Sequence, residues 1–180
     1  MANIEITDEV AYQREDVFKT FRDELTELVP YLPDVKAIEV KERNKVDDNT
    51  MKVVNLWEAQ ADDIPRLARS FIKPDMLKWT DYATWRQDAW ECDWTMEVGF
   101  LQDAVTCEGT TRYRESGDGK TKIEIDGTLK VDAKEIPGVP KLGAGKVGDV
   151  VENFVVKLIT PNLTKVNRGI EQYLAGRQED

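Results

Sequence analysis

The sequence contains no histidine and only two cysteines among its 180 residues. Protein zinc sites are built mainly from Cys and His, and Cys92 and Cys107 lack a metal-binding spacing, so we expect no metal site. A nucleophilic cysteine would also lack its usual histidine base. The two thiols are therefore predicted to be small, buried apolar groups.

Long hydrophobic runs are missing as well. No stretch of about 18 apolar residues occurs, and the N-terminal residues have no apolar signal region. We therefore predict a cytoplasmic protein without stable membrane insertion, and with reduced thiols.

Positive charge is scarce: 25 Lys and Arg stand against 35 Asp and Glu, a net charge of −10. Phosphate groups of nucleic acids bind to basic surfaces, so nucleic acid is excluded as an expected partner. Simple electrostatic docking on anionic lipid is disfavoured for the same reason. Nothing in the sequence predicts a cofactor or an oligomeric state.

The length suits one domain, which we expect to span residues 1–180, because no repeat or low-complexity linker divides the chain. Changes in apolar periodicity predict the order of its elements. We expect strands over 4–12, 35–43 and 50–59, helices over 15–29 and 62–72, a strand meander over 77–131 and a long helix over 146–174.

The meander contains four of the five tryptophans, all within residues 78–94. Three hairpins, with turns at 87–88, 99–102 and 117–119, place its apolar residues on one face, and a slip of one residue would turn that face outward. The predicted partners are Trp85 with Trp90, Met96 with Val105, and Tyr113 with Ile123. Gly109 opposite Gly127 would let the sheet bend or a helix approach closely.

This apolar face must be covered by another layer, and the helix over 146–174 is the obvious one. Its apolar stripe keeps its phase across Pro161. A single helix kinked at the proline is therefore expected. Two helices broken at Thr160 are the alternative, since the residue before a proline resists the helical conformation.

This element order, with the segment "YLPDVKAIEV" between the first helix and the second strand, resembles the START-like (SRPBCC) helix-grip superfamily. The resemblance implies an α+β fold in which a curved antiparallel β-sheet wraps around a long C-terminal α-helix. It also implies an apolar cavity between the two. Members of this superfamily bind lipids, sterols, polyketides or other hydrophobic molecules, and a few are enzymes.

We therefore predict a protein that binds or transports a hydrophobic small molecule or lipid without catalysis. The cavity is expected to exceed about 300 Å³. Each tryptophan could instead fill the core. The predicted ligand-binding residues are Trp79, Trp85, Trp90, Trp94, Met96, Thr111, Tyr113, Ile123, Ile125, Val151, Phe154 and Leu158.

Two alternative functions stay open at this point. The first is an enzyme of the polyketide cyclase or aromatase type, in which Asp81 and Tyr113 are the candidates for acid–base catalysis. Asp81 falls on the apolar face, where a carboxylate marks a functional site unless the strand bends and exposes it to solvent. The second alternative is a chaperone-like module that binds a protein partner through an exposed apolar patch.

Overall fold

The computed structural model describes residues 2–60, 77–99, 103–135 and 144–178. Within these ranges, seven strands form one antiparallel sheet in the order β1-β7-β6-β5-β4-β3-β2. The strands are β1 (Ala2–Val10), β2 (Val35–Lys45), β3 (Thr50–Ala59), β4 (Lys78–Arg86), β5 (Glu91–Val98), β6 (Val105–Glu115) and β7 (Thr121–Val131). The helices are α1 (Arg14–Asp23), the 3₁₀ helices η1 (Leu25–Tyr31) and η4 (Ala133–Glu135), and α2 (Ala144–Gln178).

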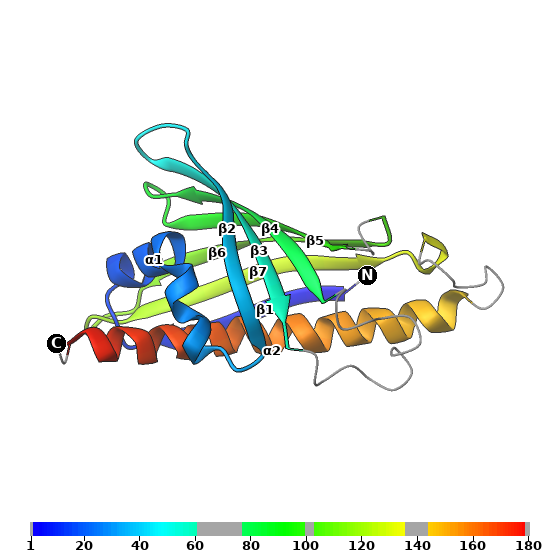
Figure 1. Ribbon diagram of the computed structural model, residues 1–180. Coiled ribbons are helices and arrows are strands. Elements are labelled where there is room, and N and C mark those ends of the chain that lie inside the picture. The colour runs from blue at the N-terminus through cyan, green and yellow to red at the C-terminus, as the bar shows by residue number, and fades with distance from the viewer. Residues whose placement is uncertain (1, 61–76, 100–102, 136–143, 179–180) are drawn as a thin grey trace.

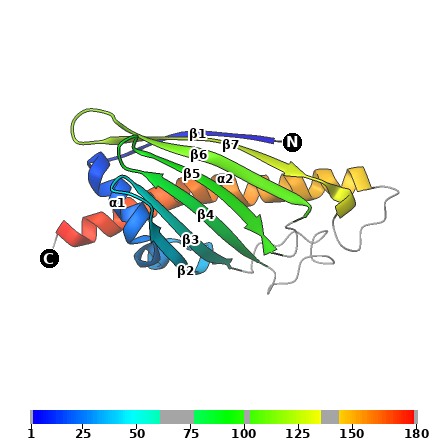
Figure 2. The same cartoon turned by 90° about the horizontal axis from the view of Figure 1, so that it is seen from above.

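The sheet curves over α2, which runs beneath it along the length of the molecule (Figure 1). Seen from above, the strands fan across the helix, and α1 lies near the end where the C-terminus emerges (Figure 2). α2 packs against β1, β7 and η1. The predicted α+β architecture, with a curved antiparallel sheet around a long C-terminal helix, is thus confirmed.

Pro161 lies inside α2, which continues without a break from Ala144 to Gln178. The alternative of two helices separated at Thr160 is therefore wrong. None of the described helices is long and apolar enough to cross a lipid bilayer. The predicted short helix over 62–72 falls outside the described residues.

The first predicted helix is divided into two elements. α1 ends at Asp23, and η1 continues the chain to Tyr31 with Pro30 inside it. In a 3₁₀ helix, side chains three residues apart lie on the same side. Leu25 and Leu28 use this spacing, and both are buried. The expected α-helix over 15–29 therefore extends six residues beyond the observed end of α1.

Polar contacts attach the C-terminal half of α2 to the rest of the fold. Arg168 donates hydrogen bonds to both carboxylate oxygens of Asp8, at 2.7 Å each. The amide of the buried Asn167 donates to the same carboxylate at 3.0 Å. Tyr173 donates its hydroxyl to Glu24 in the segment between α1 and η1, at 2.8 Å. These contacts hold α2 against the first strand and the first helix.

The predicted faces of the meander are correct, but two of the three predicted registers are wrong. Tyr113 pairs with Ile123, and Gly109 with Gly127, as expected. Trp85 instead pairs with Cys92, and Met96 with Cys107, so both hairpins are displaced by two residues. Because side chains alternate with a period of two, such a displacement changes partners without changing faces.

Candidate functional site

A cavity of about 100 Å³ lies between the inner face of the sheet and the C-terminal half of α2. The sheet supplies most of its wall, while Phe21, Leu25, Val166 and Asn167 close it from α1, η1 and α2. Its volume is smaller than the 300 Å³ expected. Seven of the predicted ligand-binding residues line it: Trp85, Trp94, Met96, Thr111, Tyr113, Ile123 and Ile125.

The end of the cavity near α1 is closed by an aromatic cluster. Phe18 of α1 is fully buried, and its ring meets Trp85 and Tyr113 edge-on at centroid distances of 5.1 and 5.3 Å. Edge-to-face contacts of this kind add to the stabilisation from buried area. Trp85 and Tyr113 therefore pack in the hydrophobic core and also line the cavity.

Trp94 occupies the space that two glycines leave free. It pairs with Gly109, which pairs with Gly127 on the next strand. A Cβ at Gly109 would lie 2.5 Å from the Trp94 ring, and one at Gly127 would lie 2.8 Å from it. The indole nitrogen donates to Thr111 Oγ1 at 3.1 Å. The glycines thus admit a tryptophan ring, whereas the sequence predicted a bend of the sheet or the close approach of a helix.

Two predicted residues do not line this cavity. Trp90 ends the β4–β5 turn with a φ of 56°. Its ring packs against Phe18 at 5.2 Å and under the Arg14 guanidinium at 4.3 Å. Trp79 stacks on its cross-strand partner Trp57 at 5.5 Å. The side chains of three further predicted residues lie outside the part of the chain that the structure describes: Val151, Phe154 and Leu158.

One wall of the cavity is polar, and β3 and β4 build it. Asn55 pairs with Asp81 across these strands, and Trp57 follows two residues later on the same face of β3. Asn55 Nδ2 donates to Asp81 Oδ2 at 3.3 Å. Asn55 is only 3% exposed, yet its Oδ1 atom has no hydrogen-bond partner among the described residues. Trp57 Nε1 is also buried without a partner there.

Asp81 remains on the inner face of β4, within an uninterrupted register on both sides. The expectation that the strand bends to expose it to solvent is therefore wrong. Burial raises the pKa of its carboxyl from 3.8 to about 6, although Asn55 and the indole N–H of Trp57 favour the charged form. The indole lies near the carboxylate, yet its Nε1 atom has no hydrogen-bond partner among the described residues. No lysine or arginine is among the described residues that line the cavity.

Sequence reasoning missed Asn55 and Trp57 as residues of the cavity wall. A signal was present, because Val53, Asn55 and Trp57 alternate along one strand, so that an amide falls between two apolar positions. Asp81 shows the same anomaly on the neighbouring strand, where it falls between Trp79 and Ala83. Pairing these two polar positions across the strands would have located the polar wall.

The phenol and thiol groups near the cavity, unlike the Asp81 carboxyl, are held in their neutral forms. Burial raises the pKa of the Tyr113 hydroxyl and of the Cys92 thiol well above their usual values. Cys107, also buried, has a pKa raised to about 12. Tyr113 shares the cavity with Asp81, but it remains protonated at neutral pH and can only donate a proton. Neither thiol forms the thiolate that nucleophilic chemistry requires.

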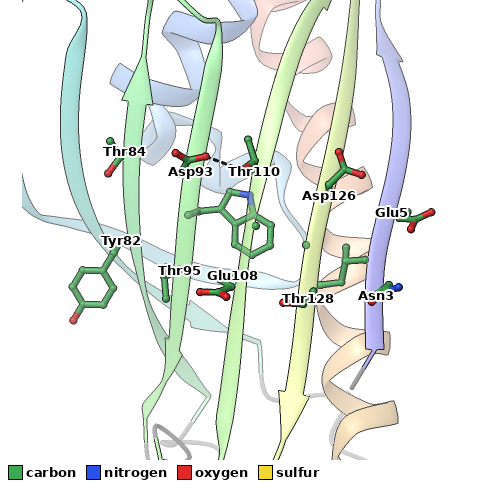
Figure 3. Close-up of a pocket in the computed structure, with 14 residues that line it drawn as sticks. Asn3, Glu5, Tyr82, Thr84, Asp93, Thr95, Glu108, Thr110, Asp126 and Thr128 are labelled. Atoms are coloured by element: carbon green, nitrogen blue, oxygen red, sulfur yellow. Dashed lines mark hydrogen bonds between the residues drawn. The ribbon is translucent and has the colours of Figure 1, made fainter.

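A second hollow, of about 710 Å³, lies on the outer face of the sheet (Figure 3). Polar side chains cover it, as the sequence predicts for the solvent face. Two of the four carboxylates that line it have partners: Asp93 accepts a hydrogen bond from Thr110 at 2.7 Å and pairs with Arg86, and Asp126 pairs with Arg112. The unpaired buried polar atoms lie in the inner cavity, which is therefore the stronger candidate site.

The family described as "Protein of unknown function (DUF2505)" matches residues 6–174, and the chain belongs to this family. No curated protein matches the sequence.

Solved structures share the fold at low sequence identity. TTHA0849 from Thermus thermophilus is 19% identical with a TM-score of 0.68, and the match covers 98% of this chain and 99% of that one. The Zhui aromatase/cyclase from Streptomyces sp. R1128 is 14% identical with a TM-score of 0.66, covering 98% and 94%. A START superfamily protein from Mycobacterium smegmatis is 13% identical with a TM-score of 0.56, covering 96% and 98%. The fold is therefore START-like, as the element order of the sequence suggested.

Proposed function

We propose that this protein binds a small hydrophobic molecule in the cavity between the sheet and α2. The observation that carries the proposal is the cavity itself, which apolar and aromatic side chains line. Protein interiors are close-packed, and spaces larger than a water molecule are few. A preformed space with apolar walls and a few polar groups is typical of small-molecule sites.

The burial of the tryptophans favours this function over a partner-binding module. All five tryptophans are buried or half-buried. Among the described residues, the exposed large hydrophobic side chains are Val40, Val46 and Tyr82, which do not form a continuous patch by sequence or strand position. Isolated exposed apolar residues are normal on soluble proteins and do not mark an interface.

The START-like neighbours support the same proposal without identifying the ligand. One of them is an aromatase/cyclase by its name, but identities below 20% carry only the fold to this chain. The binding function therefore rests on the cavity, and its ligand must be found by experiment.

Binding of toluene tests the proposal, since apolar cavities of about 150 Å³ bind benzene and this cavity of about 100 Å³ calls for a ligand no larger than a single ring. We expect a dissociation constant of about 1 mM, which corresponds to roughly −4 kcal/mol. The indole N–H resonances of the tryptophans provide the NMR readout. Replacing Ala83, which lines the cavity, by Leu should weaken binding at least about tenfold by filling the space.

Thr84→Leu is the matched control. Thr84 is the next residue on β4, and it lines the outer hollow rather than the cavity. The control should bind toluene like the unaltered protein. Equal affinity in the Ala83 and Thr84 variants, or no binding to the unaltered protein at millimolar concentrations, would refute the proposal.

A further inference from the structure

The polar wall of the cavity contains one buried hydrogen-bond acceptor and one buried hydrogen-bond donor, and neither has a partner among the described residues. Asn55 Oδ1 is a hydrogen-bond acceptor without a donor, and Trp57 Nε1 is a donor without an acceptor, among the described residues. Both side chains line the same cavity, beside the Asp81 carboxyl. Nearly all buried polar groups in proteins are hydrogen-bonded, so two exceptions on one wall require an explanation.

The orientation of the Asn55 amide follows from its neighbour. An ionised carboxylate only accepts hydrogen bonds, so the amide NH₂ group must face Asp81, as the 3.3 Å contact records. The carbonyl oxygen is then left on the other side of the amide group. Rotating the amide would place its oxygen against the carboxylate and leave a donor unpaired instead. Either orientation therefore leaves one buried polar atom of Asn55 for an outside partner.

A ligand group that pairs with both of these atoms must donate one hydrogen bond and accept another. A hydroxyl group donates to Asn55 Oδ1 and accepts from Trp57 Nε1. A hydrocarbon satisfies neither atom. An ammonium group can donate to Asn55 and Asp81, but it cannot accept from the indole.

A carboxylate is the poorest candidate for this wall. It can accept from Trp57, but it cannot donate to Asn55, and it would lie beside the like charge of Asp81. Without a lysine or arginine among the described cavity residues, nothing there offsets that repulsion.

We propose that Asn55, Trp57 and Asp81 select a hydrophobic ligand that carries an uncharged hydroxyl group, an alcohol or a phenol, over the matching hydrocarbon or carboxylate. This inference rests on the proposed binding function and adds the chemical class of the ligand. A site that hydrogen-bonds a hydroxyl group rejects an analogue without it, because the buried polar groups are then left unpaired.

Three aromatic probes of similar size separate these classes: p-cresol, toluene and p-toluate. Their dissociation constants should be measured at pH 7.5 by NMR titration of the indole N–H resonances. We expect p-cresol to bind about tenfold more tightly than toluene and at least tenfold more tightly than p-toluate, as one good buried hydrogen bond allows. The Trp57 indole resonance, assigned with Trp57→Phe, should move downfield with p-cresol and not with toluene.

Asn55→Leu should abolish the preference, so that toluene binds at least as tightly as p-cresol. Trp57→Phe keeps an aromatic ring but removes the N–H group, and it should reduce the preference by several-fold. This second variant provides the test if Asn55→Leu does not fold. Asn44→Leu, which removes an exposed amide from the adjacent strand β2, should leave all three affinities unchanged.

The outcomes separate the two proposals. If toluene binds and p-cresol binds no more tightly, the hydroxyl selectivity is refuted while cavity binding stands. Retention of the full p-cresol preference in both the Asn55 and Trp57 variants also refutes it. If none of the three probes binds, the proposed function itself fails.

Discussion

Replacing Asp81 by asparagine should raise the free energy of unfolding at neutral pH and leave it almost unchanged in acid. Burial raises the pKa of this carboxyl from 3.8 to about 6, so the folded protein binds the proton more tightly than the unfolded chain does. The contribution of Asp81 to stability is therefore full below pH 3.8 and is lost as the pH rises towards 6. Above that pH the ionised carboxylate destabilises the fold.

The magnitude follows from the two pKa values. Each pH unit of difference corresponds to about 1.4 kcal/mol, so the ionised carboxylate costs about 3 kcal/mol at pH 7.5. At pH 4 the same relation gives a destabilisation of only about 0.5 kcal/mol from this carboxyl. Asparagine has nearly the same shape and can still accept the hydrogen bond from Asn55. Asp81→Asn should therefore gain up to about 3 kcal/mol at pH 7.5 and very little at pH 4.

Urea unfolding followed by tryptophan fluorescence at both pH values measures this difference. Asp8→Asn is a control with the opposite sign. Burial opposes the charge of Asp8, but hydrogen bonds from Arg168 and Asn167 outweigh it and hold the pKa below 3.8. That variant should lose about 1 kcal/mol at pH 7.5, and the loss should shrink as the pH falls below 3.8. A gain for Asp81→Asn that is equal at both pH values, or a loss at pH 7.5, would contradict the reasoning.

Three further results are expected. Gly109→Ala should destabilise the protein by about 1–3 kcal/mol, because the new Cβ would lie 2.4 Å from a backbone oxygen, whereas Gly145→Ala meets nothing within 4 Å and should be neutral or slightly stabilising in urea unfolding. Phe18→Ala should lose about 3–5 kcal/mol in the same assay, because this fully buried ring contacts three other aromatic rings. Cys92 and Cys107 should react with a thiol-specific disulfide reagent at pH 8 only as fast as the protein unfolds; rapid reaction of either in the native state would contradict their raised pKa values.

The faces of the meander could be predicted from the sequence because apolar residues alternate over a long run and a slip by one residue would expose them. The third hairpin was also correct in register, since its turn residues determine its geometry. Gly117, Asp118 and Gly119 all have positive φ values, between 49° and 78°. Glycine and aspartate tolerate this conformation more readily than other residues do. The conformational preferences of these turn residues therefore account for the register of the third hairpin.

The first hairpin of the meander could not be predicted in this way. Its turn is longer than the expected pair Gln87-Asp88, and Trp90 adopts a φ of 56°, which is uncommon for a bulky residue. Packing against Phe18 and Arg14, which are distant in the sequence, accompanies this conformation. A preference that arises from tertiary contacts leaves no local signal, so the wrong turn length displaced the partners by two residues.

The tryptophans and the polar wall carry different kinds of information about function. Trp85 and Trp94 fill space that the fold itself creates, against Phe18 and beneath the paired glycines, so their presence is explained by packing. Asn55, Trp57 and Asp81 have no such explanation, because an unpaired buried acceptor, an unpaired buried donor and a half-buried carboxylate all oppose folding. Sites where local rules are broken at the expense of stability are commonly functional. The polar wall is therefore a better guide to the ligand than the aromatic residues, although those are far more conspicuous in the sequence.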